Sequence, residues 1–556
     1  MCVENVVADT PHSNVNNKRP SELYALGKSP IKVDILAHYL KQYPDQKVAL
    51  ELLEGFTEGF SLKYQGPRIP TEAKNLKSVA QAPEIFKKKI EKEISLDRIS
   101  GPFSERPLPN LRISPLGLVP KKDGDFRVIH HLSYPESGSV NDFIDPALCS
   151  VHYASIDDAV NKIQTLGKGA LLGKSDIKSA FRLLPVNPQD FDLLGFKIEE
   201  QFYFDKCLPM GASISCSLFE KFSTFIQWQV EKQCVHYTPV MLHYLDDFLF
   251  GGQAGSNECQ SLMQIFRTTC TLLGVPIAEG KTEGPSTVLT FLGIEIDTEN
   301  MILRLPRDKL SELKQLIKGT QTKKKATLKT LQSLIGSLNF ACQVVRPGRA
   351  FIRRIIDLTR GVKKPHHNIR LTLGIKADLN MWLEFLEGYN GVTLMPDMFW
   401  ASNDALEIFT DSAGGKEMGL GIYFQGRWAF SQWPKKWFDM GLLRNITFLE
   451  LFPVVVALTM WGEQLQNKKL LFYIDNEAVV MVINKKSSKC PMVMLLVRKL
   501  VLITLKYNIV IKAEHIPGKT NLIADAISRC QWARFRNLAP EADTHPAMIP
   551  LQVWHL

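Results

Sequence analysis

The chain has 556 residues, of which 45% are hydrophobic and 22% are charged, and this composition excludes a wholly disordered or fibrous protein. The length allows about three to five domains. The net charge is +10, but residues 301–370 alone hold 17 lysines and arginines against three acids, a local charge of +14, and the remainder carries −4.

Targeting and cross-linking signals are missing from the sequence. No apolar run reaches the roughly 20 residues that cross a bilayer, and the first residues do not form a signal peptide. The ten cysteines are scattered and no pair has C-x-x-C spacing, which argues against zinc knuckles and a disulfide framework. We therefore expect an intracellular protein, cytoplasmic or nuclear, that is neither secreted nor bound to a membrane.

The first three hundred residues divide into two predicted segments. Residues 1–100 form an N-terminal tail and a helical extension, with helices expected over 33–43 and 83–95. Residues 101–300 alternate strand-like and helical runs, which is an α+β pattern. They include an expected hairpin over 116–128, because Asp123-Gly124 is a strong turn signal between two apolar strands.

The remainder divides into three predicted segments. Residues 301–400 are the basic segment, with helices expected over 309–318, 328–344 and 377–387 and with Pro396 as a linker. Residues 401–530 give strands, a helix, a strand, a helix and a strand, the order of a compact α/β domain. Residues 531–556 are proline-rich and predict an irregular tail.

Three acids lie where apolar strands end. Asp246 and Asp247 join two strand-like runs in MLHYLDDFLFGG, and Asp176 ends a third run in ALLGKSDIKSAF. Adjacent acids repel one another unless a cation neutralises them, although a solvated turn or a helix cap is the structural alternative. Together they could hold two Mg²⁺ ions, which would activate a 3′-hydroxyl and stabilise a pyrophosphate leaving group.

Five blocks between Leu118 and Ile296 resemble the fingers and palm of reverse transcriptases, in family order: LVPKKDGDFRVIHHLS, KSDIKSAF, LPMGASISCSLF, YLDD and FLGIEI. The resemblance implies a right-hand polymerase with fingers, palm and thumb that copies RNA into DNA. It makes Asp176, Asp246 and Asp247 the ligands of two Mg²⁺ ions, with Mn²⁺ as a substitute.

The same resemblance implies a nucleotide site and a primer site. Phe181 matches the aromatic gate that crowds a ribose 2′-hydroxyl, and Met210 departs from the retroviral Gln, which changes the contact to the nucleotide. The implied nucleotide-binding residues are Lys121, Lys122, Arg127, Phe181, Met210, Gly211 and Lys281. The turn that grips the primer end is implied at Phe291, Leu292 and Gly293.

A second set of acids lies in the carboxy-terminal segment. Asp411 and Asp475 end strands, Glu450 lies in a segment that also reads as a helix capping box, and Asp525 follows a helix start. In strand, helix, strand, helix order, the four resemble the metal ligands of ribonuclease H, whose two Mg²⁺ ions hydrolyse RNA. His515 resembles the mobile histidine that aids product release.

Two features of this segment, the letters DSA at Asp411 and Pro453, allow other interpretations. The letters DSA at Asp411 are similar to an aspartic-protease motif, but Ala413 breaks it and no second copy is present. Pro453 would fall inside the helix that carries Glu450, so we expect the helix either to begin later than the capping box indicates or to bend.

The two activities imply RNA template, DNA primer, RNA–DNA hybrid and deoxynucleoside triphosphates as partners. The ending IPGKTNLIADAISRCQWARFRNLAPEAD is similar to the DIRS and Ngaro class of retrotransposons, whose partner enzyme is a tyrosine recombinase. A separately encoded recombinase or integrase is therefore an expected partner.

Two other functions compete with this interpretation. A catalytically inactive, transposon-derived nucleic-acid-binding protein should have lost some of the acids, and all seven are present. An RNA-dependent RNA polymerase is disfavoured by Phe181 and by the ribonuclease H resemblance.

The basic segment follows the implied primer grip, where the thumb and connection belong. Either it is a solvated helical face or it contacts the phosphates of a duplex that runs between the two acid sites. The expected duplex contacts are Lys323, Lys324, Lys325, Arg346, Arg349, Arg353 and Arg354.

Overall fold

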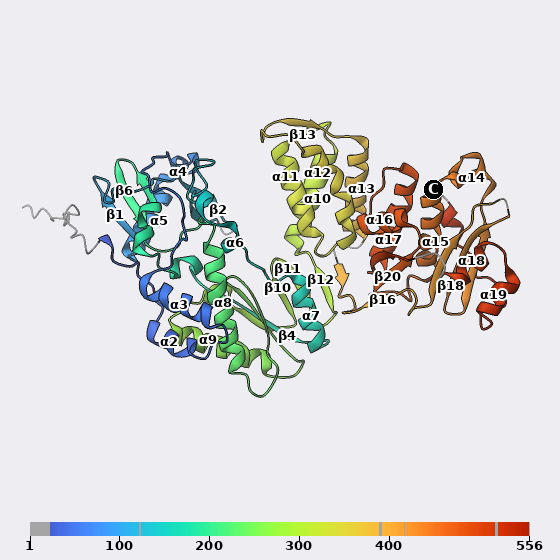
Figure 1. Ribbon diagram of the computed structural model, residues 1–556, viewed down its shortest axis with the longest axis horizontal. Coiled ribbons are helices and arrows are strands. Elements are labelled where there is room, and N and C mark those ends of the chain that lie inside the picture. The colour runs from blue at the N-terminus through green and yellow to red at the C-terminus, as the bar shows by residue number, and fades with distance from the viewer. Residues whose placement is uncertain (1–22, 122–123, 389–391, 416, 517–520, 555–556) are drawn as a thin grey trace, which may run out of the picture. The chain divides into compact units, whose positions relative to one another are not determined.

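The computed structural model describes residues 23–121, 124–388, 392–415, 417–516 and 521–554 (Figure 1). Contacts divide the chain into two compact units, one of residues up to 159 with 170–286 and one of 160–169 with 287–556. The predicted segments 301–400 and 401–530 thus belong to a single unit. Within the described ranges, no helix is long and apolar enough to cross a membrane.

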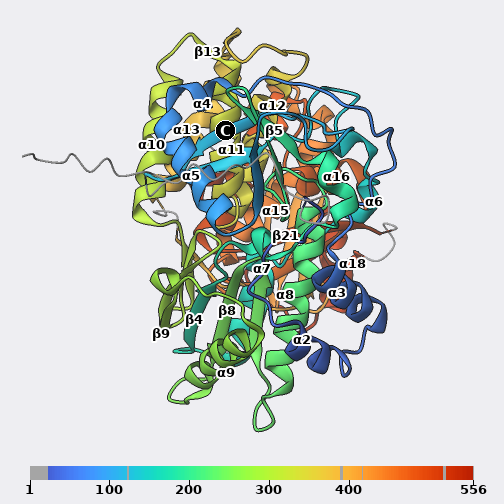
Figure 2. The same cartoon turned by 90° about the vertical axis from the view of Figure 1, so that its left-hand side faces the viewer.

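The centre of the first unit is an antiparallel sheet in the order β7-β8-β4-β9. Its strands are β4 (Leu171–Asp176), β7 (Val240–Tyr244), β8 (Asp247–Gly252) and β9 (Glu283–Ser286). Helices α8 (Ser215–Lys232) and α9 (Glu258–Leu273) pack on the sheet and on each other (Figure 2). Buried aromatic side chains, among them Phe248 and Phe266, fill the space between sheet and helices.

The N-terminal extension is part of this core. Helices α2 (Val33–Leu40) and α3 (Gln46–Glu58) pack on α9 and α8 and bury Leu36, Leu52 and Phe56 in the same cluster. The predicted helices over 33–43 and 83–95 are confirmed, the second as α5 (Pro83–Ser95), whereas α3 was missed.

A second layer of the first unit holds the hairpin. The sheet β1-β6-β5 and the hairpin β2-β3 pack against α5 through Phe86, Ile90, Leu118 and Phe196. The remaining elements are β1 (Ile99–Phe103), β2 (Leu116–Pro120), β3 (Phe126–His130), β5 (Gly195–Ile198), β6 (Gln201–Asp205), α4 (Lys77–Gln81) and α6 (Pro146–Cys149). Most of helix α7 (Ile156–Leu166) belongs to the second unit. The hairpin expected over 116–128 is confirmed as β2-β3.

The second unit begins with the sheet β10-β11-β12-β15 and four helices, with a two-stranded sheet β13-β14. Their bounds are β10 (Val288–Phe291), β11 (Ile294–Asp297), β12 (Ile302–Arg304), β13 (Lys325–Thr327), β14 (Asn368–Arg370), β15 (Val392–Leu394), α10 (Arg307–Gln321), α11 (Leu328–Ala341), α12 (Arg353–Thr359) and α13 (Leu373–Gly388). All three predicted helices of the basic segment are confirmed as α10, α11 and α13.

The rest of the second unit has an antiparallel sheet β17-β18-β19 and a parallel sheet β16-β20-β21 with helices around them. Their bounds are β16 (Trp400–Ser402), β17 (Ile408–Ser412), β18 (Gly419–Phe424), β19 (Arg427–Gln432), β20 (Lys469–Ile474), β21 (Val510–His515), α14 (Lys435–Asp439), α15 (Ile446–Trp461), α16 (Glu477–Lys485), α17 (Pro491–Lys506), α18 (Leu522–Ser528) and α19 (Trp532–Leu538). The α/β order predicted for 401–530 is confirmed.

The last segment is ordered where an irregular tail was expected. Residues 532–538 form α19, and beyond it the Trp428 indole Nε1 donates to the Asp543 carbonyl at 2.7 Å. The Trp554 ring packs on Trp437, with centroids 5.5 Å apart. The prolines in the sequence indicated a loose tail, but Trp532 and Trp554 contact neighbouring aromatic rings, Trp532 packing on Trp428 and Trp554 on Trp437.

Candidate active sites

The three acids of the first unit meet at one end of the central sheet. Asp176 is the last residue of β4 and pairs in register with Asp247, the first residue of β8. Asp246 lies in the β7-β8 turn, where Leu245 has a left-handed φ of 54°. The Asp246 carbonyl accepts from the Ile177 amide at 2.9 Å, which fixes the turn beside the end of β4. The predicted grouping of these acids is therefore present.

Electrostatic crowding at this sheet end is partly relieved by one lysine. The Lys281 Nζ lies 2.7 Å from Asp176 Oδ2. Burial and the charge of Asp176 raise the pKa of Asp246. Desolvation of its carboxyl group, followed by the charges of Asp246 and Asp176, raises the pKa of Asp247 to about 6 even though the residue is exposed. The site therefore holds more negative charge than Lys281 offsets.

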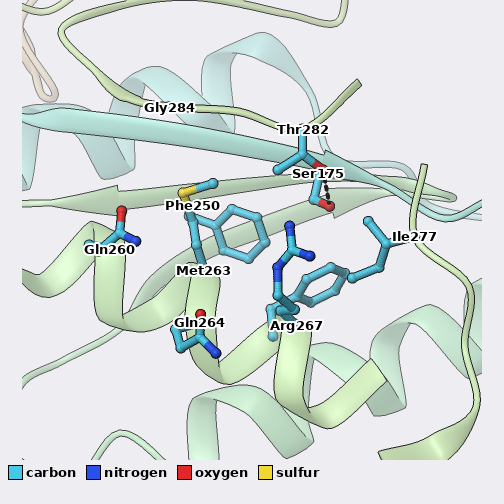
Figure 3. A pocket seen from close by; sticks show the side chains of 10 residues that line it. Ser175, Phe250, Gln260, Met263, Gln264, Arg267, Ile277, Thr282 and Gly284 are labelled. Atoms are coloured by element: carbon cyan, nitrogen blue, oxygen red, sulfur yellow. Dashed lines mark hydrogen bonds between the residues drawn. The ribbon is translucent and has the colours of Figure 1, made fainter. Parts of the chain in front are cut away.

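Lys281 is held in place by the segment that carries it. Ser175 precedes Asp176 and Thr282 follows Lys281, and their hydroxyl oxygens are hydrogen-bonded at 3.1 Å (Figure 3). Both side chains border a cavity of about 160 Å³ that also contacts Met263 and Arg267 of α9. The Ser175–Thr282 hydrogen bond ties the lysine segment to β4 and so fixes the Lys281–Asp176 ion pair.

The hairpin β2-β3 supplies the predicted basic residues. Lys121 lies 3.1 Å from Asp125, and Lys89 contacts the same carboxylate at 2.8 Å, so hydrogen bonds from the two lysines hold the pKa of Asp125 well below its usual range. Arg127 is exposed, and its charge lowers the pKa of Asp246 against the effect of burial. Lys122 lies outside the described residues.

Phe181 and Gly211 occupy constrained positions in the same unit. Phe181, in the short 3₁₀ helix η3 (Ala180–Leu183), is half-buried and lies edge-on to Phe219 at 5.8 Å. Gly211 has a φ of 135°, and a Cβ there would lie 1.8 Å from the His130 carbonyl oxygen. The Met210 carbonyl accepts from the His130 amide at 2.8 Å, so this segment is fixed against the base of the hairpin.

The expected primer grip forms the tight β10-β11 turn of the second unit. Leu292 and Gly293 both have positive φ, at 48° and 76°. Lys309 Nζ donates to the Gly293 carbonyl at 3.0 Å and lies 4.0 Å from the centre of the Phe340 ring. The Phe291 side chain is only 2% exposed, so the surface of this turn is offered by Leu292 and Gly293 instead.

The four acids of the second unit also converge. Asp411 lies in β17, Glu450 in α15, Asp475 directly after β20 and Asp525 in α18. Burial first, then the charges of Asp525 and Asp475, raise the pKa of Asp411 to about 6. Burial with the charges of Asp411 and Asp475 raises the pKa of Glu450 to about 8. These mutual effects place all four carboxyl groups in one electrostatic site.

Two arginines and a serine support this second site, and the sequence reasoning missed them. Asp525 is held by Arg529 at 2.6 Å and by Arg534 at 2.8 Å. The Ser528 hydroxyl donates to Asp411 Oδ2 at 2.5 Å, which ties α18 to β17. The spacing of Asp525 and Arg529, four residues apart on a helix, was a readable signal. Arg534, on the next helix, offered none.

The start of α15 corrects the expectation that this helix begins later than the capping box indicates. Asn445 caps this helix and accepts from the Phe448 amide at 3.1 Å, so α15 begins earlier than the capping box indicates. Pro453 lies inside the continuous helix, and Glu450 is not the capping residue. The structural alternative for Glu450 is therefore wrong, and its side chain belongs to the acid site.

His515, at the end of β21, is exposed, and its Nε2 lies 3.2 Å from the Asp475 carbonyl oxygen. The ring nitrogen must donate in this pair, because a carbonyl oxygen only accepts. His515 thus lies beside the acid site, as predicted.

The approach of α18 to β18 yields a prediction at Gly421. A Cβ at this position would lie 2.4 Å from the Ala524 carbonyl oxygen and 2.6 Å from the Ser528 amide nitrogen. Gly421→Ala should push α18, and with it Asp525, away from the sheet. We expect a loss of about 1–3 kcal/mol in the free energy of unfolding, measured by urea denaturation. Gly414→Ala is the control, because nothing lies within 4 Å of its added Cβ; equal stability losses would contradict the packing argument.

The chemistry of both sites suits a hard cation. Carboxylate oxygens are the ligands Mg²⁺ prefers, and burial, followed by the charges of neighbouring acids, raises the pKa of Asp247 and Glu450, so a bound cation would stabilise their charged forms. As they stand in the described part of the chain, no three His, Cys, Asp or Glu side chains are gathered closely enough to hold a metal ion. Lys281 and the pair Arg529 and Arg534 neutralise acids there instead.

The seven predicted duplex contacts fall into two groups. Lys323, Lys324 and Lys325 lie at the β13 end of α11, whereas Arg346 and Arg349 follow its other end. A 14-residue helix such as α11 is roughly 20 Å long, so the groups are not one patch. Arg353 is paired with Asp357 and Arg354 with Asp378, which lowers their value as phosphate contacts.

The structure adds cations that the sequence reasoning missed. Lys325 pairs in register with Arg370, and the Lys329 amide donates to the Pro365 carbonyl, so two segments about forty residues apart form one surface. Its exposed cations are Lys323, Lys324, Lys325, Lys329, Lys363, Lys364 and Arg370, which we call the basic tip. Within the described ranges, none of these seven has an ion-pair partner.

Comparison with known proteins decides the character of the first unit. Residues 119–296 match the family model "Reverse transcriptase (RNA-dependent DNA polymerase)". The chain contains a reverse transcriptase domain. Its matched residues include the last two residues of β2, all of β3 and all three acids at the end of the central sheet.

Curated relatives each match part of this chain. "Protein P" of Duck hepatitis B virus (strain China) is 30% identical over 169 residues, 30% of this chain and 20% of the relative. "Protein P" of Heron hepatitis B virus is 28% identical over 186 residues, 33% and 22% of the two chains. The Gag-Pro-Pol polyprotein of Simian retrovirus SRV-2 is 24% identical over 277 residues, 48% and 14%. The chain thus spans about a fifth or less of the length of these relatives.

Solved structures with a similar fold include two of the foamy viral protease-reverse transcriptase. The one in complex with dsDNA is 15% identical, with a TM-score of 0.46, and covers 89% of this chain and 99% of that one. The one in complex with RNA/DNA hybrid is 14% identical, with a TM-score of 0.45, and covers 93% and 65%.

Proposed function

We propose that this chain is an RNA-directed DNA polymerase. The observation that carries the proposal is the grouping of Asp176, Asp246 and Asp247 at one end of the central sheet, inside the reverse transcriptase domain. The exposed Arg127 and Lys281 would neutralise the triphosphate of an incoming deoxynucleotide. Phe181 would exclude a ribose 2′-hydroxyl, and Gly211 would let backbone approach the nucleotide closely.

We further propose that the second unit holds a ribonuclease H-like domain that degrades the RNA strand of the hybrid. Burial together with the charges of neighbouring acids raises the pKa of Asp411 to about 6 and that of Glu450 to about 8, which supports this. Arg529 and Arg534 would keep Asp525 oriented, and His515 would contact the leaving product from beside Asp475.

Each acid set would hold two Mg²⁺ ions, with Mn²⁺ as a substitute. When bound, such ions activate the attacking hydroxyl or water and stabilise the leaving oxygen. Lys281, Arg529 and Arg534 now neutralise part of each set, so metal binding would have to compete with these ion pairs.

Primer extension tests the polymerase proposal. A DNA primer on an RNA template, given Mg²⁺ and deoxynucleotides, should be extended, whereas ribonucleotides should support at least about 100-fold less synthesis because of Phe181. Equal use of both nucleotides would indicate an RNA polymerase. No extension, with retained binding of the hybrid, would indicate a catalytically inactive nucleic-acid-binding protein.

We propose that the basic tip contacts the phosphates of the template–primer duplex. Replacing Lys323, Lys324 and Lys325 with Gln should lower processivity and flatten the dependence of log K on log salt concentration by about 2 to 3, with little change in nucleotide choice. Duplex binding measured by fluorescence anisotropy at several salt concentrations checks this.

The matched control removes three cations of the second unit that each have an acidic partner. Lys318 is paired with Glu387, Arg360 with Asp357 and Lys468 with Asp397. Their triple replacement with Gln removes the same charge and should change the salt slope by less than about 1. An unchanged salt slope in the Lys323, Lys324 and Lys325 variant would indicate that the basic tip is a solvated surface that does not contact the duplex.

We infer that the chain belongs to a retrotransposon, most like the DIRS and Ngaro class. The sequence of residues 516–543 supports this inference, and a separately encoded recombinase or integrase would then complete integration. A recombinase gene beside the coding sequence would support the assignment, and an integrase gene there would favour an element with long terminal repeats.

A further inference from the structure

A network of four ionisable side chains, centred on the buried Asp205, links segments that carry nucleotide-binding residues of the first unit. Asp205, at the end of β6, is 4% exposed and accepts from Arg182 NH1 at 2.7 Å and from His130 Nδ1 at 3.0 Å. The Arg182 Nε donates to Glu93 of α5 at 2.9 Å. One buried carboxylate therefore joins three separate segments of the chain.

Both ring nitrogens of His130 face oxygen atoms in this network. Its Nε2 lies 3.2 Å from the Gly195 carbonyl oxygen and its Nδ1 3.0 Å from Asp205 Oδ2. Burial would raise the pKa of Asp205, but Arg182 and the hydrogen bond with His130 outweigh it and hold that pKa below its usual value. Asp205 and Glu93 thus share Arg182 as a partner.

Two members of the network adjoin different parts of the nucleotide site. Arg182 directly follows Phe181, and its NH1 also donates to the Cys207 carbonyl at 2.9 Å. His130 ends strand β3 of the basic hairpin, and its backbone amide donates to the Met210 carbonyl. Its carbonyl oxygen lies so close to Gly211 that no Cβ could be accommodated there. The gate, the hairpin base and the Met210-Gly211 segment are therefore fixed to one another through buried charge.

We propose that Arg182, Asp205 and His130 are positioning residues that hold the aromatic gate, the basic hairpin and the Met210-Gly211 segment in the arrangement an incoming deoxynucleotide requires. This role rests on the polymerase function proposed above. A buried charge left without its partner is costly, so removal of one member displaces the others instead of leaving them in place. The displacement should weaken binding of the nucleotide and leave binding of the duplex unchanged.

The test variant is Arg182→Met, which keeps the length of the side chain and removes its charge. Its matched control is Arg68→Met in the same unit, because Arg68 likewise bonds two carboxylates, with NH2 2.6 Å from the buried Asp190. The bonds of Arg68 reach none of the nucleotide-binding residues. Both variants should lose stability in thermal unfolding, which makes stability alone uninformative.

Steady-state primer extension distinguishes the two roles. Arg182→Met should raise the KM for deoxynucleotide by about tenfold or more and lower discrimination against ribonucleotides, while the KM for template–primer stays within about twofold. Arg68→Met should leave the deoxynucleotide KM within about twofold. Glu93→Gln, at the partly exposed end of the network, should give an intermediate rise and is read in the same way if Arg182→Met does not fold.

Different outcomes would contradict the positioning role and the polymerase function. An active wild-type chain whose Arg182→Met variant loses kcat only in proportion to its folded fraction, with an unchanged deoxynucleotide KM, would overturn the positioning role. A folded wild-type chain without DNA synthesis would overturn the polymerase function itself.

Discussion

Asp247→Asn should abolish DNA synthesis on an RNA template, with a loss of about 10²- to 10³-fold or more in the rate of primer extension. The substitution keeps the shape of the side chain and removes one of three carboxylates at the sheet end. Because Asp247 pairs in register with Asp176 and follows Asp246, its charge cannot be supplied from another position.

Stability should move in the opposite direction. The pKa of Asp247 is raised to about 6, so its charged form is disfavoured in the fold at neutral pH. Removing that charge relieves repulsion with Asp246 and Asp176, and the thermal midpoint of Asp247→Asn should equal or exceed that of the wild type. A loss of activity at undiminished stability separates a chemical role from a structural one.

The control for this prediction is Asp45→Asn in the same unit. Asp45 caps α3 by accepting from the Val48 amide at 3.0 Å, and Asn caps helices equally well. Extension should stay within about twofold of the wild type in this variant, and chelation of divalent metal should stop extension in both. Full activity of Asp247→Asn with Mg²⁺ would show that the three acids are not the polymerase site.

Local patterns and the family resemblance together predicted the acid sites. Strand-ending acids such as Asp176 and the Asp246-Asp247 turn are visible in a short window of sequence, since apolar runs stop at charged residues there. The register that brings Asp176 to Asp247 joins residues 71 positions apart, whereas the ends of the strands could be predicted from the sequence.

Contacts between charged residues that are far apart in the sequence could not be predicted from the sequence. Nothing near His130 indicates that it meets Asp205, and nothing near Lys325 indicates Arg370 as its register partner. These contacts depend on which strands become neighbours. The same limit applies to Pro453, where Asn445 outcompetes the capping box and the hydrophobic surroundings of α15 keep the helix continuous through a proline.

Asp475→Asn should abolish cleavage of the RNA strand in an RNA–DNA hybrid, by about 10²- to 10³-fold, while primer extension stays within about twofold of the wild type. Asp475 lies directly after β20, is exposed, and its charge raises the pKa of both Asp411 and Glu450. Removing it should therefore leave the fold as stable as before or more so. Cleavage of an RNA strand labelled at its 5′ end measures the effect.

Glu477→Gln gives the matched control, because Glu477 is exposed in the first turn of α16, two residues beyond Asp475, and is not among the four acids. Its variant should cleave the hybrid within about twofold of the wild type. Retained cleavage in Asp475→Asn would remove this residue from the nuclease site. Equal loss of cleavage and extension would instead show that the two activities are coupled or that the variant misfolds. The thermal midpoint of the variant distinguishes these two explanations, because a misfolded variant would have a lower midpoint. Asp475→Asn relieves repulsion with Asp411 and Glu450, so a correctly folded variant should not have a lower midpoint than the wild type.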